Sequence, residues 1–224
     1  MELSGGLDMN EIEKKELKNE LKYKGTVILT YRIEYPEITS SYYKLGSNIF
    51  NEYNKSKAMN LENYIINQLF KDAIQLYEYN TAHGYPVMIY EVIQEYTITY
   101  NKDFVISLYE DNYEFTGGAH GNTIRTSQNW DLRSGKSIPL SNLFPNNPYY
   151  IVDILKNVNN QIQDKLQTNP TQYFDNYCEL VLNTFSLENY YITSPDSIAI
   201  FFQQYNIAPY SSGIPVFYMP IFRI

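Results

Sequence analysis

The chain has 224 residues, of which 44% are hydrophobic and 19% charged, and its formal net charge is −8. This length and composition predict a globular protein with one large domain or two small ones. The acidic balance disfavours the basic surface that nucleic-acid binding requires and favours a basic partner. Because no apolar run reaches the ~18 residues of a membrane span, we do not expect the chain to cross a membrane.

The N-terminal residues and the single cysteine bear on the cellular compartment. Residues 1–24 contain no apolar signal-peptide core. We therefore expect either a cytoplasmic protein or, if an upstream anchor was removed, an extracytoplasmic or cell-surface one. Cys178 is the only cysteine, which excludes an intrachain disulfide and a Cys-based metal cluster. We interpret Cys178 as a small buried hydrophobic residue.

The first half of the chain changes its hydrophobic period twice. Residues 1–24 are rich in Lys and Glu, and this mixed charge predicts a solvated tether. Apolar residues at alternate positions over 27–35 predict a half-buried strand, which Pro36 ends. Spacings of three and four over residues 47–79 predict a long helix on a sheet, with residues 55–60 as the expected place of a break.

The second half predicts further strands and a second helix. Residues 101–103 form a short polar connection that predicts a hairpin between two neighbouring strands. A helix is predicted over 149–167 and ends before Pro170, whereas residues 173–187 are ambiguous. The predicted strands of this half span residues 87–100, 104–114, 122–132, 190–192, 197–203 and 216–222.

These elements predict an α+β fold. We expect antiparallel sheets with helices packed on one face, in two closely associated strand–helix–strand halves that meet near Asn101.

The most informative segment is 115–121, Phe-Thr-Gly-Gly-Ala-His-Gly. Its small residues surround His120 directly after a strong strand signal, which predicts a sharp turn that can approach a partner closely. A zinc site needs three or four ligands, and neither Cys pairs nor a His-Glu-x-x-His spacing supplies them. We therefore interpret His120 as hydrogen-bonding the turn, and we expect no metal and no cofactor.

Residue patterns typical of enzymes are missing from the sequence. There is no Gly-x-Ser-x-Gly elbow, and the glycines near His120 lack the Lys-Ser/Thr of a P-loop. Paired carboxylates for glycoside cleavage would come from Glu110, Asp111 and Glu114, but acidic residues on a strand and turn are usually solvated. We expect no catalytic residue and a protein that is not an enzyme.

A second loop, residues 207–213, has the composition of a contact surface. Pro209 presets the backbone, Tyr210 supplies a rigid amphipathic ring, and the Ser-Ser-Gly that follows permits close approach. This pattern is typical of protein-binding loops. A plain inter-strand loop with Tyr210 folded back on the sheet explains it equally well.

Both loops lie in segments that closely resemble the C-terminal domain of RsiV-like proteins. Two further segments between the loops share this resemblance, namely Asn-Trp-Asp-Leu-Arg-Ser-Gly-Lys and Leu-Ser-Asn-Leu-Phe. Tyr-Pro-Glu-Ile and the long Asn-rich helix look like the module that precedes it there and in PdaC-type peptidoglycan deacetylases. The resemblance implies a PdaC-type module at 25–101 and an RsiV-like domain at 102–224. The quoted segments span residues 113–121, 129–136, 140–144, 201–213 and 35–38.

The resemblance also implies a function. RsiV-like proteins are membrane-anchored anti-sigma factors whose external domain binds lysozyme. A non-catalytic extracytoplasmic recognition domain for a basic protein such as C-type lysozyme is therefore expected, with the two loops side by side at one end of the sheet. The alternative is a peptidoglycan or cell-wall-binding accessory module without a signalling role. The partner-binding residues that the resemblance implies are Gly118, Ala119, His120, Pro209, Tyr210 and Ser211.

Overall fold

The computed structural model describes residues 10–221, which fall into two compact units. Unit 1 comprises the described residues up to Tyr96 together with Glu110–Thr123 and Leu132–Gly135. Unit 2 comprises Thr97–Tyr109, Ile124–Asp131 and the described residues from Lys136 onward.

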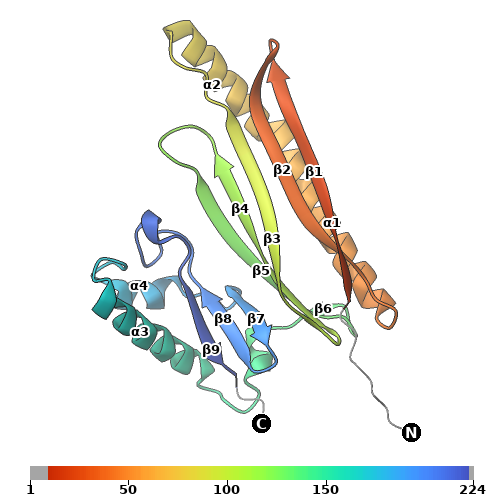
Figure 1. Ribbon diagram of the computed structural model, residues 1–224, viewed down its shortest axis with the longest axis vertical. Coiled ribbons are helices and arrows are strands. Elements are labelled where there is room, and N and C mark those ends of the chain that lie inside the picture. Colours follow the sequence, from red (N-terminus) through yellow and green to blue (C-terminus); the bar gives the residue numbers. More distant parts are fainter. Residues whose placement is uncertain (1–9, 222–224) are drawn as a thin grey trace. The chain divides into compact units, whose positions relative to one another are not determined.

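The described strands form two sheets, ordered β1-β2-β3-β4-β5-β6 and β7-β8-β9 (Figure 1). With the helices described below they confirm the expected α+β class. Most predicted strands lie within a few residues of the observed ones. The strands are β1 Glu11–Tyr23, β2 Thr26–Thr39, β3 Tyr90–Lys102, β4 Val105–Phe115, β5 Asn122–Asp131, β6 Lys136–Ser137, β7 Tyr190–Ser194, β8 Ser197–Phe201 and β9 Val216–Pro220.

Strand β1 shows that the predicted tether is wrong from residue 11 onward. The strand pairs antiparallel with β2 along its length. Its Leu17 and Leu21 pack against the core of unit 1, and Lys14 Nζ lies 3.0 Å from Glu34 Oε1 on β2. An edge strand that carries many charges resists pairing with other chains, so its sequence looks like a solvated segment. Residues 1–9 of the predicted tether lie outside the described residues.

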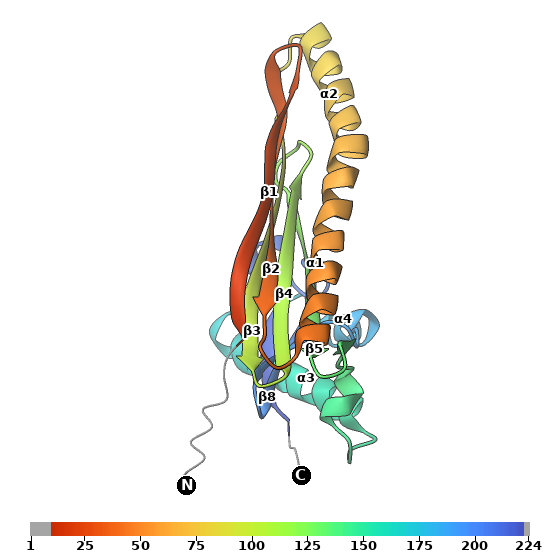
Figure 2. The same ribbon diagram turned by 90° about the vertical axis from the view of Figure 1, so that its right-hand side faces the viewer.

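One long helical segment packs on the strands of unit 1. It consists of α1 Lys44–Tyr64, a π-helical turn Ile65–Leu69 and α2 Phe70–His83 (Figure 2). The break expected at residues 55–60 is absent. The irregularity lies one turn later, because the wider π turn inserts a residue and keeps both of its ends, Ile65 and Leu69, buried in the core.

Strands β2 and β3 run parallel, with Leu29 opposite Tyr90 and Ile33 opposite Gln94. The sequence predicted antiparallel sheets, so this pair is a correction. The chain leaves β2 through the long helical segment before it returns as β3. A helical connection of this kind brings the next strand back in the same direction, whereas a short hairpin reverses it.

Unit 2 is built around the antiparallel strands β7, β8 and β9. Helix α3, Tyr150–Thr168, confirms the helix predicted at 149–167, and the ambiguous stretch contains α4, Tyr177–Thr184. The buried residues Ile154, Val158 and Ile162 recur along α3 at intervals of four and join the core formed with β9. No helix among the described residues is long and apolar enough to cross a membrane.

Candidate functional site

The glycine-rich segment 116–121 forms the expected sharp turn between β4 and β5 in unit 1. Gly118 has φ +99°, a left-handed conformation that favours glycine, and no atom lies within 4 Å of the position of a β-carbon there. Gly121 is buried, and a β-carbon on it would lie 2.4 Å from the ring of Tyr113. One glycine therefore sets the turn, and the other packs it against an aromatic ring.

His120 makes the hydrogen bond expected for it, because its Nδ1 lies 2.9 Å from the carbonyl oxygen of Gly121. The turn leaves Gly118, Ala119 and His120 exposed. Within residues 10–221, no three His, Cys, Asp or Glu side chains gather as a metal-binding group. The turn thus presents an imidazole on a fixed backbone to solvent.

The second loop is held rigidly within unit 2. Its residues Tyr210–Ser212 form a short 3-10 turn in which Ser212 N donates to Pro209 O at 2.9 Å. The Ser212 hydroxyl also donates to Gln172 O at 2.8 Å, which ties the turn to a distant part of the chain. A loop anchored in this way loses little conformational entropy when a partner binds.

Tyr210 packs against a second tyrosine at this loop. The ring centroids of Tyr205 and Tyr210 lie 5.8 Å apart, and Tyr205 is 51% exposed. Tyr210 and Pro209 are half-buried, whereas Ser211 is exposed. Tyr205 has φ +64°, which is rare for a bulky residue and is found mostly at functional or strained positions. The sequence pattern does not single out Tyr205, although it lies only five residues before Tyr210.

The structure divides the six residues implied by resemblance between the two units. Gly118, Ala119 and His120 belong to unit 1, and Pro209, Tyr210 and Ser211 belong to unit 2. The side-by-side arrangement of the two loops stays a prediction.

The acidic residues considered for catalysis are less solvated than expected. Glu110 is only 2% exposed and forms an ion pair with Lys57. Burial also raises the pKa of the Glu114 carboxyl above its usual value. The expectation of a solvated Glu110 is wrong because its side chain points from β4 toward helix α1, where it meets Lys57.

Cys178 is exposed, which corrects its interpretation as a buried residue. It lies in the first turn of α4, a helix whose buried residue is Val181. Cys178 is the second residue of α4 and stands at the N-terminal end of the helix, before the turn in which Val181 enters the core.

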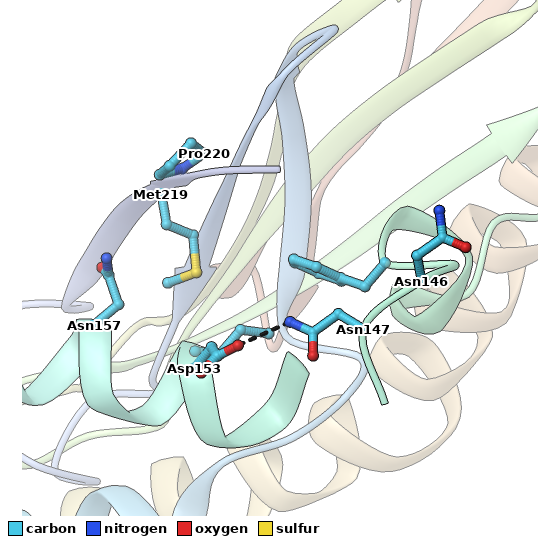
Figure 3. A pocket seen from close by; sticks show the side chains of 8 residues that line it. Asn146, Asn147, Asp153, Asn157, Met219 and Pro220 are labelled. Carbon is cyan, nitrogen blue, oxygen red and sulfur yellow. Dashed lines mark hydrogen bonds between the residues drawn. The ribbon is translucent and has the colours of Figure 1, made fainter. Parts of the chain in front are cut away.

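Unit 2 also contains a pocket of about 380 Å³, which the sequence does not indicate (Figure 3). It lies between the turn 144–147, the first half of α3 and the end of β9. Figure 3 shows Met219 entering it from β9, Asp153 and Asn157 on α3, and Asn147 on the turn. Three segments far apart in the sequence contribute to its lining, so no local motif indicates it.

Two protein-family models match the chain. The model described as "Deacetylase PdaC" matches residues 11–123. The model described as "Protein of unknown function (DUF3298)" matches residues 141–221. The first match includes β1, whose mixed charge had indicated a tether.

Solved structures share the fold. A DUF3298 family member from Bacteroides fragilis NCTC 9343 has a TM-score of 0.69 at 19% identity, and the match covers 94% of this chain and 90% of that one. A DUF3298 family protein from Pseudomonas aeruginosa PAO1 has a TM-score of 0.53 at 16% identity, with 94% and 91% covered. At these identities the likeness concerns the fold alone. The comparison with curated proteins finds no significant match.

Proposed function

Because the chain belongs to the Deacetylase PdaC family over residues 11–123 and carries a DUF3298 domain over 141–221, we propose that it is a non-catalytic recognition protein of the bacterial cell envelope. The word deacetylase is part of the family's name, and we do not transfer that activity to this chain. We assign no chemical step to this chain, whose buried candidate acid, Glu110, is neutralised by Lys57.

The observation that carries this proposal is the tyrosine pair that Tyr210 of the anchored second loop forms with Tyr205, which precedes the loop. Tyr205 and Tyr210 form an aromatic surface on a backbone fixed by the Ser212 hydrogen bonds. Preorganised aromatic side chains are common energetic anchors of protein interfaces because they bury a large area at a low entropic cost. The exposed turn at residues 118–120, in unit 1, carries the other three residues that the resemblance implies.

The partner of this surface is a basic protein, and C-type lysozyme is the candidate, as in the RsiV-like anti-sigma factors that the sequence resembles. The formal net charge of −8 supports a cationic partner. Complementary charge accelerates association and makes it sensitive to salt. Binding should therefore weaken as ionic strength increases.

The test is to mix the full chain with C-type lysozyme at low salt and to measure complex formation by calorimetry and gel filtration, with muramidase activity as a second measurement. We expect a complex and inhibition, and we expect Tyr210→Ala to weaken binding about tenfold or more. Tyr42→Ala is the matched control, since Tyr42 is a 77% exposed tyrosine of unit 1 outside both loops. Absence of a complex and of inhibition contradicts the lysozyme proposal.

The competing function is a cell-wall-binding module. The rings of Tyr79 and His83, with centroids 4.3 Å apart, favour it, because they form an exposed aromatic surface at the end of α2. This function predicts that insoluble peptidoglycan retains the chain and that Tyr210→Ala leaves the retention unchanged. Retention that Tyr79→Ala abolishes would favour the module over protein recognition.

A further inference from the structure

We propose that the pocket of unit 2 is a binding site for an uncharged saccharide whose ring carries an acetamido group. The pocket has a volume of about 380 Å³, within the usual range of small-molecule sites. It combines an apolar floor with a rim of amides and one carboxylate. The proposal concerns a second site, separate from the tyrosine pair assigned to protein recognition.

The floor of the pocket is apolar and rigid. Phe144 stacks on Tyr150, with ring centroids 5.3 Å apart and an interplanar angle of 15°. Ile154 is 1% exposed within the core of unit 2, and Met219 is 5% exposed. An aromatic ring with a thioether beside it suits the C–H face of a sugar and the methyl of an acetamido group, because neither ligand surface carries hydrogen-bonding groups.

The turn that carries part of the rim is also preorganised. Asn147 N donates to Phe144 O at 3.1 Å, which closes a β-turn with Pro145 at its second position. The Asn147 side chain then accepts a hydrogen bond from Tyr149 N at 2.9 Å. Both bonds fix the rim before a ligand arrives, which lowers the entropic cost of binding.

The rim offers donors and acceptors together. Asn147 Nδ2 donates to Asp153 Oδ2 at 2.8 Å and so orients the carboxylate, which has capacity for further hydrogen bonds (Figure 3). Asn157 Oδ1 accepts from Gln161 Nε2 at 2.6 Å, and its own amide hydrogens remain donors. Hydroxyl and acetamido groups each both donate and accept, so this mixed rim matches a saccharide.

The charges at the pocket disfavour an anionic ligand. No Lys, Arg or His belongs to the described lining, and Asp153 places a negative charge in the first turn of α3. An acid in that position also interacts favourably with the positive end of the helix dipole, which would otherwise attract an anion. A neutral ligand therefore fits the site better than a phosphate or a carboxylate.

The experiment titrates the full chain, without lysozyme, with the β-1,4-linked trimer of N-acetylglucosamine up to about 20 mM and follows backbone amide NMR shifts. We expect saturable shifts at Asn146, Asn157 and Met219. The glucose trimer, which lacks the acetamido group, should bind at least about threefold more weakly. Absence of saturable shifts at these residues, or equal affinity for the two trimers, overturns the proposal.

Two variants locate the binding. Asn157→Ala and Asn146→Ala should each lower affinity about threefold to tenfold, as the loss of one hydrogen bond predicts. Asn160→Ala is the matched control, because Asn160 is an exposed residue of α3 outside the pocket lining. An equal loss in Asn160→Ala, or stronger shifts at the same amides with an acetylated trialanine amide, overturns the proposal.

The variant Tyr210→Ala distinguishes a failure of the saccharide proposal from a failure of the protein-recognition proposal. Tyr210 does not belong to the pocket lining. Tyr210→Ala should therefore leave the affinity for the saccharide unchanged while it weakens binding to lysozyme. A loss of saccharide affinity in Tyr210→Ala would place the saccharide at the loop and contradict the pocket assignment.

Discussion

Ser107 donates its hydroxyl hydrogen to Asn129 Oδ1 at 2.7 Å, and both side chains are buried in unit 2. The same hydroxyl oxygen accepts hydrogen bonds from Thr99 Oγ1 at 3.0 Å and from Ile192 N at 2.9 Å. Asn129 Nδ2 donates to Tyr190 O at 3.0 Å. One hydroxyl thus uses its single donor and both acceptors, so the network joins β3, β4, β5 and β7.

We expect Asn129→Leu to destabilise the protein by about 2 to 4 kcal/mol, because the change leaves the buried Ser107 hydroxyl and the Tyr190 carbonyl without this partner. Chemical denaturation measures the loss. Asn122→Leu on the exposed part of β5 should change stability by less than about 0.5 kcal/mol. Equal effects of the two substitutions would show that the network contributes little.

Gly46→Ala should destabilise unit 1 severely. A β-carbon on Gly46 would lie 1.9 Å from the backbone oxygen of Leu132, and a backbone atom cannot move aside as a flexible side chain can. We expect a loss of about 3 kcal/mol or more in the free energy of unfolding. Asn48→Ala, at an exposed position of the same helix, is the control. A Gly46→Ala protein that kept the melting temperature of the natural chain would refute the close contact.

Lys57→Met should cost about 3 kcal/mol, because it leaves the buried Glu110 carboxylate without the ammonium group. The double variant Lys57→Met with Glu110→Gln removes the charge as well and should recover most of the lost stability. A double-mutant cycle by urea denaturation measures this coupling. Additive losses in the double variant would mean that the two charges do not interact energetically.

The burial of the Glu114 carboxyl predicts a pH dependence of the stability. Burial raises the pKa of its carboxyl from 4.5, so the folded state binds the proton more tightly than the unfolded state does. Its contribution to stability is therefore fully present below the unfolded pKa and is lost as pH rises through the folded pKa. Glu114→Gln should gain stability relative to the natural chain between about pH 4 and about pH 8.

Chemical denaturation of Glu114→Gln and of the natural chain, at about pH 4 and about pH 8, isolates this effect, because the two proteins share all other carboxyl groups. Glu52→Gln, which changes an exposed acid of α1, should follow the natural chain at both values. A difference between Glu114→Gln and the natural chain that is the same at both pH values would contradict the burial of the ionised carboxyl.

The sequence predicted those elements whose residues repeat with one clear period. The buried residues of α3 recur every four positions, and the apolar residues of β2 alternate, so both elements were identified. The edge strand β1 was not predicted because its many Lys and Glu residues leave its pattern polar, although Leu17 and Leu21 pack on the core. Its partner strand, rather than its own composition, makes it a strand.

The candidate sites also divide into those that local sequence indicates and those that arise only from packing. The turn at Gly118 was predictable because a glycine signals an unusual backbone conformation within a few residues. The pocket was not predictable, since Asn147, Asp153 and Met219 meet only after α3 and β9 have packed. Burial of Glu110 was also not predictable, because it follows from the contact of β4 with Lys57 of helix α1 and not from the residue type.

The pairing of β1 with β2 has a practical consequence for anyone who shortens this protein. Deleting residues 10–24 would strip a complete ladder of main-chain hydrogen bonds from β2 and uncover Leu29 and Ile33, which are fully buried. A bare edge strand of 14 residues is a template on which a second molecule can add its own strand. The charged segment at the start of the chain therefore protects the protein against self-association.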